Sequence, residues 1–96
     1  MARTAGPKKF TKKWGSDMTL SVEEVADGFD LTVRVKERYT DRFVTEKVKC
    51  RNMEQLLEAA SYNAASVAMR ARRTAPGRSV VRNMIQAGLA ECSRAR

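Results

Sequence analysis

Two stretches of this chain place basic side chains at every second position, an arrangement that suits phosphate binding. They span residues 29–39 and 42–51, and the basic side chains are Arg34, Lys36, Arg38, Lys47, Lys49 and Arg51, joined by the aromatic Phe43. Residues two apart in a strand lie on one face of a sheet. Guanidinium and ammonium groups in such a row bind phosphate oxygens, and arginine also reads base edges.

A second basic stretch, "GPKKFTKKWGSD" at residues 6–17, mixes lysines with aromatic side chains. Its candidate nucleic-acid contacts are Lys8, Lys9, Lys12, Lys13 and Trp14. Glycine and proline here disfavour regular structure, so residues 1–16 are predicted to form a flexible, disordered basic arm. Trp14 would stack on a base or cover the hydrophobic core beside Met18. A merely solvated tail is the alternative interpretation.

Five arginines within thirteen residues, with no acid between them, form a secondary candidate anion site. They are Arg70, Arg72, Arg73, Arg78 and Arg82. Free backbone N–H groups at a helix start and arginine side chains both favour anions. The alternative is that these arginines complement a helix dipole and are otherwise solvated.

Nothing in the chain matches a known catalytic pattern. It has no histidine, no glycine-rich phosphate loop, no nucleophile motif and no recognisable pair of catalytic acids. Cys50 and Cys92 each fall on an apolar face, where we expect them to pack in the core. We therefore predict a non-enzymatic protein without a metal or a cofactor.

Length and composition favour one small soluble domain over residues 17–96. The chain has 96 residues, of which 43% are hydrophobic and 31% charged, and its formal net charge is +8. Such an excess favours polyanionic partners, nucleic acid or an acidic protein surface. No apolar run suits a membrane span, and two cysteines suggest a reducing, cytoplasmic setting.

Side-chain alternation predicts an α+β fold that begins with a three-stranded antiparallel meander at about 18–26, 29–39 and 42–51. A two-residue turn at Asp27-Gly28 would place Val22 opposite Val33 and Leu20 opposite Val35. A second turn, at 40–41, would place Arg34 opposite Lys47 and Lys36 opposite Thr45. The like-charged pair would then need an anion to compensate it.

Two helices are expected to follow, at about 53–72 and 79–93, and to cover one face of the sheet. Asn52 is a good N-cap, and Gln55 completes an approximate capping box. Gly88 interrupts the second helix, which suggests a close approach to the first helix. The basic side chains of the strands would then lie on the uncovered face.

A three-stranded antiparallel sheet followed by a helix, over residues 18–72, resembles the arm-binding domains of tyrosine-family integrases and the related plant transcription-factor domains. That resemblance implies DNA binding through the sheet. The size and layout also resemble small phage-encoded inhibitors, including some anti-CRISPR proteins. We therefore predict a DNA-binding or RNA-binding protein, with a protein-interaction module or inhibitor as the alternative. An open sheet edge would also allow a homodimer.

Overall fold

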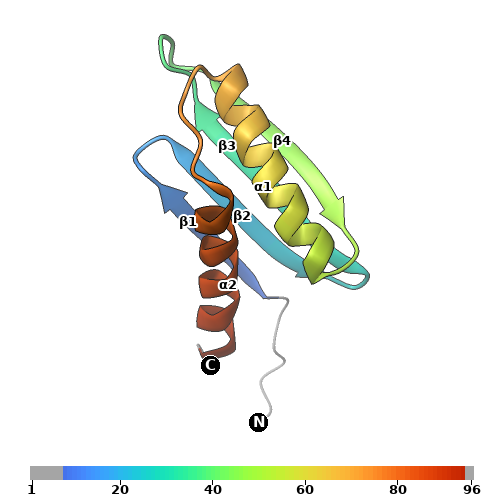
Figure 1. Ribbon diagram of the computed structural model, residues 1–96. Coiled ribbons are helices and arrows are strands. Elements are labelled where there is room, and N and C mark those ends of the chain that lie inside the picture. The colour runs from blue at the N-terminus through green and yellow to red at the C-terminus, as the bar shows by residue number, and fades with distance from the viewer. Residues whose placement is uncertain (1–7, 95–96) are drawn as a thin grey trace.

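The computed structural model describes residues 8–94, which form a four-stranded antiparallel sheet with two helices on one side (Figure 1). The elements are β1 (Lys9–Trp14), β2 (Met18–Val25), β3 (Gly28–Lys36), β4 (Phe43–Cys50), α1 (Met53–Arg70) and α2 (Arg78–Arg94). The strands follow one another across the sheet in chain order. α1 packs on β3 and β4, and α2 packs on β1 and beside α1. The α+β prediction is confirmed, but the predicted number of strands is wrong.

The additional strand is β1, which occupies part of the segment predicted to be a flexible arm. It pairs with β2 so that Phe10 faces Val22 and Trp14 faces Met18. Both aromatic side chains pack against the core. The arm prediction is therefore wrong for residues 9–14, because their alternate side chains have an apolar surface to cover. The first seven residues of the predicted arm lie outside the described residues.

The β2–β3 hairpin turns one residue earlier than predicted. Val25 pairs with Gly28, so that Leu20 faces Val33 and Val22 faces Leu31. Gly28 has a φ of 144°, and a Cβ on it would overlap the carbonyl oxygen of Cys50. Glycine is needed at this position because the first residue of β3 lies against the end of β4, and not because it is the second residue of the turn. The predicted partners are wrong by two residues, a shift that leaves every side chain on its predicted face.

The β3–β4 connection is a six-residue loop, longer than the predicted two-residue turn. The backbone N–H of Glu37 donates to the carbonyl of Arg42 at 2.8 Å and closes the loop over residues 37–42. Arg34 consequently faces Thr45, and Lys47 faces Thr32. The predicted like-charged pair of Arg34 and Lys47 is therefore wrong, as is the pairing of Lys36 with Thr45.

The helix ends follow sequence rules closely. Asn52 caps α1 by accepting a hydrogen bond from the Gln55 backbone N–H at 2.8 Å, and the Gln55 side chain accepts one from the N–H of Arg51 at 2.9 Å. α1 stops where Arg72 adopts a left-handed conformation, with a φ of 59°.

Neither helix has the length and apolar character needed to cross a bilayer within the residues described.

The core lies between the sheet and the helices and is made by alternate strand residues and one stripe of each helix. Its fully buried large side chains are Leu20, Val22, Leu31, Val33, Val35, Leu56, Val67, Val81 and Ile85. Cys50 is also buried, as expected, whereas Cys92 is only partly buried. Gly88 does mark a close approach, but a Cβ there would overlap the ring of Phe10. The neighbour is therefore β1 and not, as predicted, the first helix.

Substitution of Gly28 by alanine tests the close approach of the start of β3 to the end of β4. The new methyl group would overlap the carbonyl oxygen of Cys50, so we expect the free energy of unfolding to fall by about 3 kcal/mol, measured in urea. Gly15→Ala is the control, because Gly15 has a φ of 65° with open space around it; its cost should be about 1 kcal/mol. Equal losses in the two variants would contradict the close approach.

Candidate nucleic-acid interface

The sheet face turned away from the helices, called here the open face, collects most of the predicted strand contacts. It consists of Lys9, Thr11, Lys13, Thr19, Ser21, Glu23, Val25, Asp30, Thr32, Arg34, Lys36, Phe43, Thr45, Lys47 and Lys49. Six of these side chains are basic, two are acidic and five carry a hydroxyl group. The face is therefore positive and rich in hydrogen-bond donors.

Cross-strand pairing arranges the open face in rows. One row runs Lys13, Thr19, Arg34 and Thr45, and the next runs Thr11, Ser21, Thr32 and Lys47. Both acids lie in a third row, between Lys9 and Lys49. The hydroxyl oxygens of Thr11 and Ser21 are hydrogen-bonded at 3.1 Å. The acids are confined to one end of the face, and the first two rows contain none.

Arg34 is supported by an aromatic ring on the same face. Its Cζ lies 3.8 Å from the centroid of the Phe43 ring, on the neighbouring strand. A guanidinium stacked in this way keeps its N–H groups, which lie in its plane, available for a ligand. The stacking holds Arg34 in place without neutralising its charge.

Ion pairing on the open face is weak. Lys49 lies 3.7 Å from Asp30, and Lys36 lies 3.9 Å from Asp41, with Lys49 and Asp41 almost fully exposed. Exposed pairs of this kind contribute little. The remaining basic side chains have no carboxylate within 4.0 Å in the part of the chain described: Lys9, Lys13, Arg34 and Lys47. These cations are available to an external anion.

On the helix-covered side, by contrast, four ion pairs join different elements. Lys12 binds Glu91 of α2 at 2.7 Å, and Arg70 binds Glu46 of β4 at 2.8 Å. The other two pairs are Arg73 with Asp17 and Arg78 with Glu58. The structure therefore places Lys12, which was predicted to contact nucleic acid, in an ion pair within the protein.

The five arginines of the secondary anion site do not form one free group. Arg73 binds Asp17 at 3.1 Å, and its side chain also donates to the carbonyl oxygens of Lys36 at 3.0 Å and Glu37 at 3.4 Å. It thereby ties the end of α1 to the end of β3. Arg70 and Arg78 are engaged in the pairs above, which leaves only exposed Arg72 and half-buried Arg82 without an ion-pair partner among the described residues.

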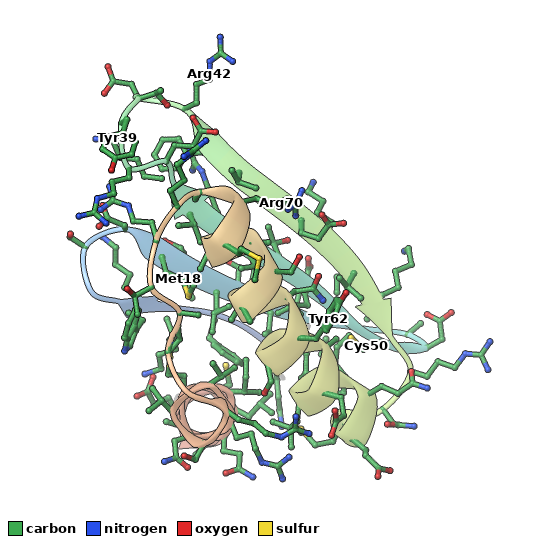
Figure 2. All side chains as sticks on the ribbon, turned by 45° about the horizontal axis from the view of Figure 1, so that its top comes forward. Met18, Tyr39, Arg42, Cys50, Tyr62 and Arg70 are labelled. Atoms are coloured by element: carbon green, nitrogen blue, oxygen red, sulfur yellow. The ribbon has the colours of Figure 1, made fainter. Side chains whose placement is uncertain are left out.

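The remaining predicted contacts lie around the edges of the open face or away from it. Arg38 and Arg51 are exposed just beyond the ends of β3 and β4, and Lys8 is exposed just before β1. Trp14 lies on the covered side, half-buried against the core. Tyr39 and Arg42 project from the loop over 37–42 at one end of the molecule (Figure 2).

Sequence reasoning missed the hydroxyl group that β1 adds to the open face beside those of β2. Thr11 and Ser21 were not predicted to face the same way, since β1 was not expected to be a strand. The alternation of Phe10, Lys12 and Trp14 with polar residues was the available signal. It was obscured because Lys12 interrupts the apolar positions.

Asp30, at the acidic end of the open face, affects the pKa of a neighbouring thiol. Burial, and secondly the negative charge of Asp30, raise the pKa of the Cys50 thiol. The Oδ1 atom of Asp30 is itself buried without a hydrogen-bond partner. Anion binding is therefore less favourable at this end than toward Arg34. No cluster of three His, Cys, Asp or Glu side chains that could hold a metal ion occurs within residues 8–94.

Comparison of the chain with protein-family models, curated proteins and solved structures found no match. The open face must therefore be judged on its own geometry and charge.

A hollow of about 810 Å³ lies elsewhere, between β4 and α1, and is lined in part by Tyr62 and Glu58. Tyr62 projects from α1 near β4 in Figure 2.

Trp14→Ala distinguishes a packing role from a base-stacking role. Because Trp14 is half-buried against the core, its loss should lower the free energy of unfolding by about 2 kcal/mol, as measured in urea. Tyr62→Ala is the matched control, since Tyr62 is 72% exposed and its removal should change stability by less than about 0.5 kcal/mol. An unaltered stability in Trp14→Ala would show that the indole does not support the fold.

Proposed function

We propose that this chain is a small non-enzymatic nucleic-acid-binding protein whose open face contacts the phosphate backbone. The observation that supports this most strongly is the distribution of ion pairs. Four cations on the open face have no carboxylate within 4.0 Å among the described residues, whereas four pairs neutralise cations on the covered side. These four cations give one side of the sheet a patch of positive charge that is available to a polyanion.

The chemistry of the open face suits a phosphate backbone. Lysine and arginine supply charge, while hydroxyl groups such as those of Thr19 and Thr32 donate hydrogen bonds to phosphate oxygens. Such contacts need an extended surface and no deep pocket. They position a protein on nucleic acid and make its affinity depend on salt.

A salt-dependent binding series tests this proposal. Charge reversal in Arg34→Glu/Lys47→Glu removes two unpaired cations from the face, so affinity for nucleic acid should fall at least about tenfold at low salt. The slope of log K against log salt should also decrease in magnitude by about 1.8, since each phosphate contact on duplex DNA contributes about 0.9. Fluorescence anisotropy measures both quantities.

The matched control is Arg72→Glu/Arg82→Glu, which makes the same change in net charge away from the open face. It should weaken binding only slightly, through the overall charge of the protein. Absent or salt-independent binding by the unaltered chain would contradict the proposal. So would equal losses in the two double variants.

A second candidate function, protein interaction, is favoured by the exposed surface of α1. Tyr62 is 72% exposed and Met69 is 76% exposed, seven residues apart along the helix. Tyrosine and methionine are enriched at protein interfaces. Phe10 and Trp14 are not available as aromatic anchors for a protein partner, because both pack against the core.

A pull-down performed with nuclease present separates the two candidates. If the protein acts through α1, a specific partner should survive nuclease, remain bound to Arg34→Glu/Lys47→Glu, and be lost with Tyr62→Ala/Met69→Ala. A partner released by nuclease, or unaffected by the α1 variant, would count against this second candidate.

A further inference from the structure

The basic side chains of the open face are unevenly spread across the four strands. β1 contributes Lys9 and Lys13 at one edge of the sheet, and β4 contributes Lys47 and Lys49 at the other. Of the two strands that lie between them, β2 has no basic residue on the open face, and β3 has Arg34 and Lys36. The lysines of the outer strands thus form two separate rows, called here the β1 rail and the β4 rail.

The spacing of the two rails suits two backbones better than one. Neighbouring strands lie about 4.8 Å apart, so three spacings separate the rails by about 14 Å. The major groove of a DNA duplex, which the two backbones border, is about 12 Å wide. One single-stranded backbone following one rail would leave the other rail without a phosphate.

The strip between the rails is also poorly suited to unpaired bases. Proteins that bind single strands stack the bases on aromatic side chains. Among the described strands, Phe43 is the one aromatic residue on the open face, and the guanidinium of Arg34 covers its ring at 3.8 Å. The central positions are hydroxyl groups, including those of Ser21 and Thr32, which hydrogen-bond but do not stack.

We infer that the open face binds double-stranded nucleic acid, with the β1 rail on one backbone, the β4 rail on the other and Arg34 facing the groove between them. This inference rests on the proposed nucleic-acid-binding function. Phe43 is a positioning residue in this arrangement, because its ring fixes the plane of the guanidinium while leaving the donor edge open. Such an edge matches the paired acceptors of a base in a groove.

The test compares a short DNA duplex with a single strand of the same length and base composition, using fluorescence anisotropy over about 50–200 mM salt. The duplex should bind at least about tenfold more tightly. Lys13→Gln and Lys47→Gln should each reduce the magnitude of the duplex salt slope by about 0.9, and the double variant should reduce it by about 1.8. Arg82→Gln, on α2, is the control and should leave the slope unchanged.

Two results would overturn the inference and leave the proposed function standing. One is that the single strand binds as tightly as the duplex. The other is that the salt slope for the duplex changes with the substitution in only one of the two rails. Absence of binding to either probe would overturn both. Circular dichroism of each variant verifies that the fold is intact.

Phe43→Leu provides a readout that a change in charge alone would not move. The variant keeps every cation, so the salt slope should remain unchanged while duplex affinity falls several-fold. Phe43→Tyr, which retains an aromatic ring, should restore the affinity. An unaltered affinity in Phe43→Leu would overturn the positioning role.

Discussion

Segregation of charge across the sheet is the constraint on which the rest of this structure depends. Glu46, Glu58 and Glu91 on the covered side each bind a lysine or arginine from another element, and Asp17 binds Arg73. These pairs lie where helices that carry basic residues pack on the sheet. They also use carboxylates that would otherwise reduce the positive charge elsewhere, and four cations of the open face have no carboxylate within 4.0 Å among the described residues.

β1 links this charge pattern to the packing of the two ends of the described chain. Its Phe10 ring occupies the space that a side chain at Gly88 would need, and its Lys12 reaches Glu91. The Sγ atom of Cys92, which lies in α2 like Gly88 and Glu91, is 3.4 Å from the carbonyl oxygen of Lys9. One strand therefore seats α2 through its covered side and supplies Lys9 and Lys13 to the open face.

Much of the architecture could be predicted because local patterns specify it. Alternation gave β2, β3 and β4, and the Asn52 cap marked the start of α1. What could not be predicted depends on distant residues: Lys12 is tolerated beside the core because Glu91 neutralises it. Strand pairing was wrong by two residues, which preserves the faces, so the open face was predicted correctly for Arg34 and Lys47 although their cross-strand partners were not.

An NMR titration tests directly whether nucleic acid lies on the open face. Amide signals of isotope-labelled protein would be followed as a short DNA duplex is added at low salt. If nucleic acid lies on the open face, the largest shifts are expected at Thr19, Thr32, Arg34 and Lys47, with small ones along the exposed side of α1. Shifts confined to α1 and α2, or no shifts in any strand, would contradict it.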